Sequence, residues 1–342
     1  MSQNDAALNA QLDPILVRQA MDLITPARRI ALLAHENPDG DCIGSALGLA
    51  LILTTLGKSC VPACADPPPR NLAFLPEIEL LVQDLGNEDF DLVIALDAGE
   101  LRRFGTLYER HQSFLERARI LNIDHHISSQ GCGQVNIIDP GAAATAEVLV
   151  LFQQQAHLPL PREAALCLLT GLITDTSSFQ FTNTTARSLE VAAELLRHGV
   201  ITETVVQPVY RERSLSQARL QAAIINNART SREGRLIWSC ATGETLRQTG
   251  ATVEMDDNSS GMLRDIAGVQ IAAFFKSYDT PDTTRLSLRC AAPYNAAELC
   301  KRLSDGLGGG HARAAGATFN RPVAETMAFV VAELEKELDK TN

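Results

Sequence analysis

The sequence lacks the features that direct proteins into or across membranes. Its N-terminus has neither the basic region nor the apolar region of a signal peptide, so we expect none. Its most membrane-like stretch, Cys42–Gly57, is shorter than the roughly 20 residues of a membrane span and contains several glycines and hydroxyl residues. This stretch is more typical of a buried helix. We therefore expect a cytoplasmic protein with no membrane partner.

The eight cysteines lack the spacing of a zinc site. The closest pair, Cys60 and Cys64, has no second pair at a matching distance. A disulfide framework is unusual in a chain of this length without a signal peptide. We expect reduced, mostly buried thiols.

A basic excess is also missing, because the net charge is −11. Proteins that hold long nucleic acids through many phosphates are usually basic, overall or in one region. The charge therefore favours small substrates or one local basic patch. We expect part of the negative charge to belong to metal ligands.

The apolar runs that are present predict an α/β fold. With 342 residues, 45% of them hydrophobic, the chain is long enough for two domains. Strand-like runs at Arg29–Ala34, Asp91–Leu96 and Ile120–Ile123 precede helical patterns at 144–156, 162–172 and 185–197. This order predicts a mostly parallel sheet flanked by helices.

The second half predicts a smaller α/β domain. Residues 211–232 have the pattern of a long helix, and strands are expected at Leu236–Ala241, Val269–Tyr278 and Arg285–Ala291, followed by a glycine-rich loop and a helix at Val323–Leu338. We expect a catalytic domain at 1–200, a helical linker at 201–232 and a substrate-binding domain at 233–342.

Titratable residues stand where the predicted strands of the first domain end. They are His35, Asp39 and Asp41 after the first strand, Asp97 after the second, Asp124, His125 and His126 after the third, and Asp175 at a helix end. Sites in open α/β sheets are built at this edge. Carboxylates and imidazoles suit a hard divalent cation such as Mn²⁺. Each motif alone also has an ordinary explanation as a turn, a helix cap or a solvated loop.

A second set of residues suits a phosphate. Gly308, Gly309 and Gly310 allow close approach of the backbone to a ligand, and His311 follows them. The guanidinium of Arg289 fits a phosphate or a base edge. A bare glycine run is otherwise a flexible loop.

Together these motifs resemble the DHH phosphoesterase superfamily, in order and in approximate spacing. The resemblance extends to Ala142–Glu147, to Asp175-Thr176 followed by Phe179, and to Gly308–His311 followed by Ala314–Gly316. Two positions depart from the family pattern: Ser177 stands where glycine is common, and Cys290 where serine is more typical.

The resemblance implies a two-metal site in a cleft between the domains. One Mn²⁺ would be held by His35, Asp39 and Asp97, and the other by Asp41, Asp97, His125 and Asp175. Mg²⁺ or Co²⁺ are possible substitutes. The nucleophile would be a hydroxide between the metals. Catalytic roles are then expected for His126, Asp97 and Asp124: His126 contacts the phosphate and acts as general acid, Asp97 bridges the metals, and Asp124 orients a ligating histidine. The substrate would be bound by His126, Arg289, Gly308, Gly309, Gly310 and His311.

The function implied is hydrolysis of short oligoribonucleotides to mononucleotides and of 3′-phosphoadenosine-5′-phosphate (pAp) to AMP. The partners would be short single-stranded RNA and small phosphorylated nucleotides, and a homodimer stays open. A phosphodiesterase for cyclic di-AMP or its linear product pApA is an alternative on the same scaffold. A non-catalytic nucleotide- or RNA-binding protein is an alternative of another class.

Overall fold

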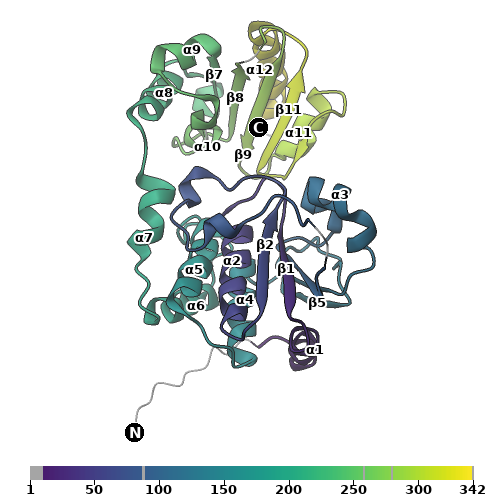
Figure 1. Ribbon diagram of the computed structural model, residues 1–342. Coiled ribbons are helices and arrows are strands. Elements are labelled where there is room, and N and C mark those ends of the chain that lie inside the picture. The colour runs from purple at the N-terminus through teal and green to yellow at the C-terminus, as the bar shows by residue number, and fades with distance from the viewer. Residues whose placement is uncertain (1–10, 87–88, 257–258, 279, 341–342) are drawn as a thin grey trace. The chain divides into compact units, whose positions relative to one another are not determined.

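The computed structural model describes residues 11–86, 89–256, 259–278 and 280–340. The chain divides into two compact units, residues 1–212 and 213–342 (Figure 1). The expected linker at 201–232 is divided between them: α7 (Thr202–Val206) and the π-helical turn η4 (Gln207–Arg211) belong to the first unit, and α8 (Leu215–Asn226) belongs to the second.

The long helix predicted at 211–232 starts later and ends earlier in the structure, so both predicted ends are wrong. The side chain of Ser214 accepts a hydrogen bond from the Gln217 amide and so caps the start of α8. After Asn226 the chain leaves the helix, and β6 (Arg229–Ser231) pairs with the edge of a sheet. Local capping and sheet pairing therefore override the helical pattern.

The first unit is built on a five-stranded sheet with the order β2-β1-β3-β4-β5. Its strands are β1 (Arg29–Ala34), β2 (Ser59–Cys64), β3 (Leu92–Leu96), β4 (Ile120–Asp124) and β5 (Val135–Ile138). All neighbouring strands are parallel, which confirms the predicted α/β class. Because helices cover both faces, β1, β3 and β4 are almost entirely buried.

Helices cover the two faces of this sheet unequally. The helices are α1 (Pro14–Ile24), α2 (Gly40–Thr54), α3 (Gly105–Leu115), α4 (Thr145–Gln155), α5 (Arg162–Asp175) and α6 (Ala186–Arg197), with 3₁₀ turns η1 (Arg70–Leu72), η2 (Ile78–Leu80) and η3 (Leu101–Phe104). One hydrophobic cluster joins α1, α2, α4, α5 and α6 to one face, and another joins α3 to the opposite face. Figure 1 shows this separation.

Helix α2 is buried along almost its whole length and packs closely against α5. A methyl group added at Gly44 would lie 2.4 Å from the carbonyl oxygen of Cys167 in α5. One turn later, a methyl group at Gly48 would meet the side chain of Leu168 at 2.9 Å. Glycine therefore permits the close crossing that fixes α2, the helix whose first turn contains Asp41.

The second unit contains a six-stranded sheet with the order β10-β11-β9-β8-β7-β6. Its strands are β6, β7 (Leu236–Thr242), β8 (Ile271–Ser277), β9 (Thr284–Cys290), β10 (Gly309–Gly310) and β11 (Ala314–Phe319). Only β7 and β8 pair in parallel among these strands. The edge strands β6 and β10, and the strand β11 beside β10, were not predicted.

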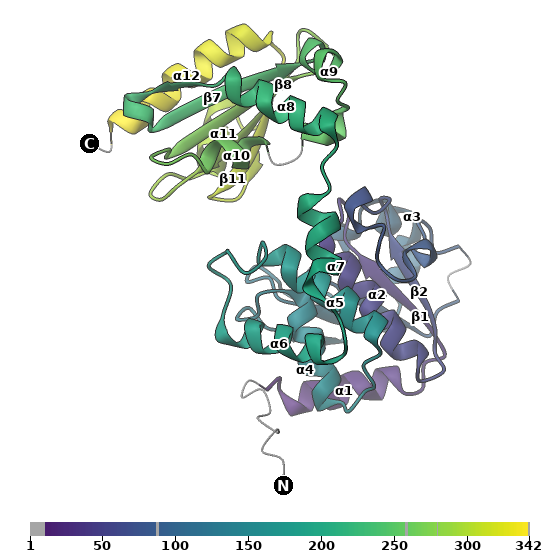
Figure 2. The same cartoon turned by 90° about the vertical axis from the view of Figure 1, so that its left-hand side faces the viewer.

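Helices pack on both faces of this second sheet (Figure 2). They are α8, α9 (Gly243–Thr249), α10 (Ser259–Arg264), α11 (Ala296–Leu303) and α12 (Val323–Asp339), with turns η5 (Arg232–Gly234) and η6 (Val253–Asp256). One core cluster joins α11 and α12 to the sheet, and another joins α8, α9 and α10 to its other face. In the described part of the chain, no helix is long and apolar enough to cross a membrane.

We predict that Gly44→Ala lowers the free energy of unfolding by about 1–3 kcal/mol, as overpacking typically does. This loss should appear although alanine favours a helix over glycine by about 1 kcal/mol, because the backbone of α5 must move. Gly309→Ala is the control, since a methyl group there would meet no atom within 4 Å. Urea denaturation measures both, and a stabilised Gly44→Ala would contradict the close crossing.

Candidate metal centre

The residues that the sequence predicts as metal ligands come together at one edge of the first sheet. His35 follows β1, Asp97 follows β3 and His125 follows β4, and the carboxyl ends of these parallel strands meet there. Three groups have ligand atoms within 4.8 Å of one another: His35, Asp39 and Cys42; Asp97, His125 and His126; and Asp41, His125 and Asp175. All the predicted ligands therefore lie in one cluster.

Asp97 lies at the centre of this cluster. Its Oδ2 lies 3.4 Å from His35 Nε2, and its Oδ1 lies 3.5 Å from His125 Nε2. Its φ of 58° is in the left-handed region, which aspartate adopts more readily than most residues. The hydroxyl of Thr145 donates a hydrogen bond of 2.8 Å to Oδ1. A carboxylate with one oxygen toward each histidine fits a ligand shared by two cations.

Asp41 faces the start of α4. Its Oδ2 accepts a hydrogen bond from the Thr145 amide at 2.6 Å, and its Oδ1 accepts one from the Ala146 amide at 2.9 Å. These amides have no partner within their own helix and lie at the positive end of its dipole. His125 Nε2 lies 4.0 Å from Asp41 Oδ2 and 3.5 Å from Asp175 Oδ2.

Thr145 is a site residue that the sequence analysis missed. The segment 142–147 resembles the family pattern, but the sequence predicts no catalytic or binding role for any of its residues. Thr145 contacts Asp41 through its amide and Asp97 through its hydroxyl, and so holds both carboxylates in place. The available signal was a hydroxyl residue at the start of a helix, where backbone amides commonly bind an anion.

The two histidines predicted as ligands both turn Nε2 toward the centre. His35 Nδ1 lies 2.8 Å from the carbonyl oxygen of Glu36, and His125 Nδ1 lies 3.2 Å from that of Ala142. A hydrogen bond from Nδ1 to a carbonyl fixes the neutral tautomer whose Nε2 can ligate a metal. Asp39 uses Oδ1 to cap α2, and its Oδ2 lies 3.9 Å from His35 Nε2.

The carboxylates of the cluster are buried and close to one another. Burial, and then the charge of neighbouring aspartates, raises the pKa of Asp97 well above its usual value and that of Asp175 to about 8. Burial also raises the pKa of Asp41. In the described part of the chain, the ion pairs of these three residues are with histidines. Buried acids without lysine or arginine partners fit divalent cations.

Cys42 is also close to this centre, which the sequence analysis did not anticipate. Its thiol is fully buried beside His35 and Asp39. Burial and the negative charges of Asp39 and Asp97 raise the pKa of Cys42 well above its usual value. Because metals bind the thiolate form, the protonated thiol is a poor ligand, and the nitrogen and oxygen donors still favour a hard cation.

His126 differs from the two inward-facing histidines. Its Nδ1 donates a hydrogen bond of 2.8 Å to Asp124 Oδ1, and its side chain is 46% exposed. That hydrogen bond raises the pKa of His126 to about 9. Asp124 was expected to orient a ligating histidine; its side chain binds the ring of His126 and the amides of His125 and His126. This arrangement suits His126 to donate a proton.

The segment after Asp175 contains unusual backbone. Ser177, Ser178 and Phe179 have φ values of 48°, 58° and 64°. This region is strained for residues with a Cβ, and glycine would relieve the strain at Ser177. Asn183 Nδ2 donates to the carbonyl oxygens of Asp175 and Ala143 at 3.1 and 3.0 Å. Asn183, which received no role from the sequence, therefore links the two chain segments that hold the ligands.

The predicted phosphate-binding residues lie together in the second unit. Arg289 in β9 pairs with Ala314 of β11, whose backbone forms two hydrogen bonds with His311. Two of the glycines have packing roles. A methyl group at Gly308 would lie 2.7 Å from the Cys300 carbonyl oxygen, and one at Gly310 would lie 2.6 Å from that of Ala314.

Comparisons with known families agree with this architecture. Residues 29–172 match the model of the DHH family, N-terminal domain, and residues 241–340 match the DHHA1 domain. The bifunctional oligoribonuclease and PAP phosphatase NrnA of Thermus thermophilus is 33% identical over 84% of this chain and 83% of its own length. The cyclic-di-AMP phosphodiesterase PdeA of Listeria monocytogenes is 24% identical, over 94% of this chain and 49% of its own.

Solved structures share the fold. An exopolyphosphatase-related protein from Bacteroides fragilis aligns with a TM-score of 0.86 at 22% identity, over 95% of this chain and 97% of that one. The exonuclease RecJ bound to manganese aligns with a TM-score of 0.54 at 18% identity, over 94% of each chain.

We predict that the two adjacent histidines have different roles. His125→Ala should reduce metal content as well as activity. His126→Ala should keep the metals but slow the chemical step by about 10²–10⁴-fold, the range typical of a general acid. Elemental analysis and single-turnover rates test this, with the exposed His157→Ala as control. Loss of metal from His126→Ala, with full occupancy in His125→Ala, would reverse the assignment.

Proposed function

We propose that this chain, which belongs to the DHH family of phosphoester hydrolases, cleaves short oligoribonucleotides to mononucleotides and pAp to AMP. The observation that carries the proposal is the buried cluster of aspartates and histidines around Asp97. Similarity to an NrnA oligoribonuclease and PAP phosphatase over most of both chains supports the choice of substrates.

The donor set fits two divalent cations. His35, Asp39 and Asp97 would hold the first, and Asp41, Asp97, His125 and Asp175 the second. Asp97 would be shared, in keeping with its two oxygens facing His35 and His125. Oxygen and nitrogen donors favour Mn²⁺, with Mg²⁺ or Co²⁺ as possible substitutes.

When bound, such a pair of cations supplies an activated water and offsets negative charge on the phosphate. The chain's own residues then have distinct tasks. Thr145 and the start of α4 hold Asp41 and Asp97 in place. In the hydrolysis the water oxygen would bond to phosphorus, the bond from phosphorus to the leaving oxygen would break, and the proton that the water loses would pass to solvent. His126, held through Nδ1 by Asp124, donates a proton from Nε2 to that leaving oxygen.

The second unit would bind the rest of the substrate. Arg289 is half-buried at one end of β9, with its Nε 3.4 Å from the hydroxyl of Ser260. Its guanidinium can pair with a phosphate through two hydrogen bonds. The exposed backbone of Gly309 and the exposed His311 beside it would add further donors.

Hydrolysis of cyclic di-AMP or pApA is the second candidate. It is supported by the similarity to PdeA, although the chain spans about half of that relative. The bond broken is of the same type, so the chemistry described above would serve both reactions. The base pockets alone would then decide between these substrates.

We predict that chelation abolishes hydrolysis and that Mn²⁺ restores it best. The reason is that the proposed cations would activate the water and offset negative charge on the phosphate, and that the buried aspartates around Asp97 have no lysine or arginine partner among the described residues. Activity on a five-nucleotide RNA is measured after EDTA treatment and readdition of Mn²⁺, Mg²⁺, Co²⁺ or Zn²⁺. Full activity after elemental analysis has verified metal removal would exclude the two-metal mechanism.

We predict that RNAs of two to five nucleotides are hydrolysed faster than a 24-nucleotide RNA. The net charge of −11 offers little attraction for a long polyanion. kcat/KM should be compared for pAp, pApA, cyclic di-AMP, a five-nucleotide RNA and the 24-nucleotide RNA. Equal or faster cleavage of the longest strand would refute the size preference, and a preference for cyclic di-AMP would favour the PdeA-like reaction.

A further inference from the structure

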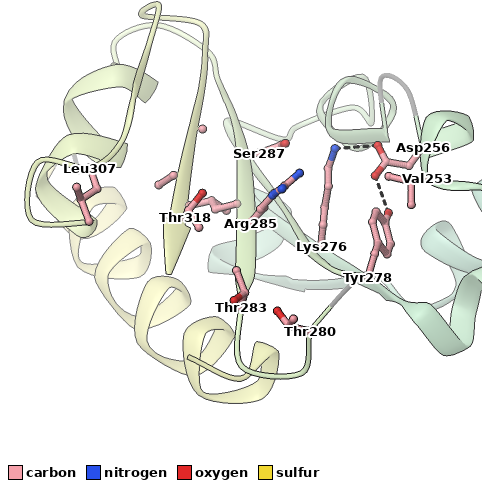
Figure 3. Close-up of a pocket in the computed structure, with 13 residues that line it drawn as sticks. Val253, Asp256, Lys276, Tyr278, Thr280, Thr283, Arg285, Ser287, Leu307 and Thr318 are labelled. Carbon is pink, nitrogen blue, oxygen red and sulfur yellow. Dashed lines mark hydrogen bonds and ion pairs between the residues drawn. The ribbon is translucent and has the colours of Figure 1, made fainter. Parts of the chain in front are cut away.

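The second unit contains a cavity of about 550 Å³ beside its sheet (Figure 3). Its lining comes from β8, β9, β11, the turn η6 and the loop before β10. This volume is within the range of small-ligand sites, which is about 300–1,000 Å³. Neither the metal centre nor the predicted phosphate-binding residues account for it.

Among the described residues, the cavity has one cationic side chain whose charge is not balanced by an acid. Arg285 is exposed and forms no ion pair within the described part of the chain. Lys276, its partner across the strands, lies 2.8 Å from Asp256, and Tyr278 donates a hydrogen bond of 2.6 Å to the same carboxylate. Asp256 therefore neutralises Lys276 and fixes both side chains along one wall, as Figure 3 shows. The guanidinium of Arg285 is left for an anionic ligand.

The strand register connects this cavity to Arg289. Arg285, Ser287 and Arg289 alternate along β9 and so share one face of the sheet. At about 3.4 Å per residue, Arg285 and Arg289 lie roughly 14 Å apart along the strand. A single phosphate group cannot reach both arginines across this distance. A ligand that contacts both must therefore have more than one anionic group or more than one residue.

The surface between the two arginines is open and rich in hydroxyl groups. Gly316 pairs with Ser287 across the strands, and both line the cavity, so no large side chain covers its floor. Thr318, which pairs with Arg285, and Thr283, on the other side of Arg285, add hydroxyl groups to the cavity. Hydroxyls can pair with a ribose or a base edge, and a mid-strand glycine often marks close approach of a ligand.

We propose that this cavity is a further nucleotide subsite, in which Arg285 binds one phosphate of an oligoribonucleotide while Arg289 holds another. The proposal rests on the proposed function, and it names the part of that substrate which the cavity takes. RNAs of several nucleotides should reach the subsite, whereas pAp and a dinucleotide are too short. The cavity thus contributes affinity only to the longer members of the substrate range.

The test compares Arg285→Ala with the wild-type full-length chain, loaded with Mn²⁺, on pAp, a dinucleotide and a five-nucleotide RNA. For the five-nucleotide RNA, KM should rise about tenfold with little change in kcat, as expected for loss of one charge-assisted contact. For pAp and the dinucleotide, KM should stay within about twofold. Arg302→Ala is the matched control, because it removes an exposed arginine from α11, which packs on the opposite face of the sheet.

Salt dependence provides a readout that a merely structural effect would not change. For the five-nucleotide RNA, the slope of log KM against log salt concentration should fall by about 0.7 in Arg285→Ala, the value for one phosphate contact with a single strand. Arg285→Glu should enlarge the KM effect. An unchanged KM for the five-nucleotide RNA, or an equal rise for all three substrates, would overturn the subsite. Failure of the wild type to hydrolyse any RNA would instead overturn the proposed function.

Discussion

The structure of the first unit depends on the crowding of buried carboxylates at one sheet edge. Asp41 and Asp97 are both almost fully buried, and Asp175 lies close to them. Burial, followed by the charges of neighbouring carboxylates, raises the pKa of Asp97 and Asp175, and burial raises the pKa of Asp41. A protein that keeps them deprotonated must bind positive charge at this point. Phosphoester hydrolysis uses the same charge to stabilise the transition state.

Neutral backbone groups and neighbouring polar side chains hold the ligands in position. The start of α4 binds Asp41, the carbonyl of Ala142 orients His125, and Asn183 joins the segment before α4 to the end of α5. Glu147 forms an ion pair with Arg187 and accepts a hydrogen bond from the amide of Ala143, in the segment before α4. Close packing of α2 against α5 then fixes the distance between the helices that bear Asp41 and Asp175.

Much of this could be predicted from the sequence, because strands buried on both faces are continuous apolar runs. β1 has the predicted bounds, and the ligands at the strand ends lie together as expected. Other features depend on contacts that no local pattern records. The strands β10 and β11 contain mostly glycine and alanine, and Thr145 acquires its role only where α4 meets Asp41. The sequence shows that Ser177 stands where the family pattern commonly has glycine. Its positive φ, and the backbone strain that follows from it, appear only in the structure.

Anomalous diffraction at the manganese edge, from crystals grown with Mn²⁺, tests the central claim most directly. The account predicts two peaks, about 3.5–4 Å apart as in other two-metal sites. Both should contact Asp97, one beside His35 and the other beside His125. A single peak, or two peaks that do not share Asp97, would contradict the proposed centre.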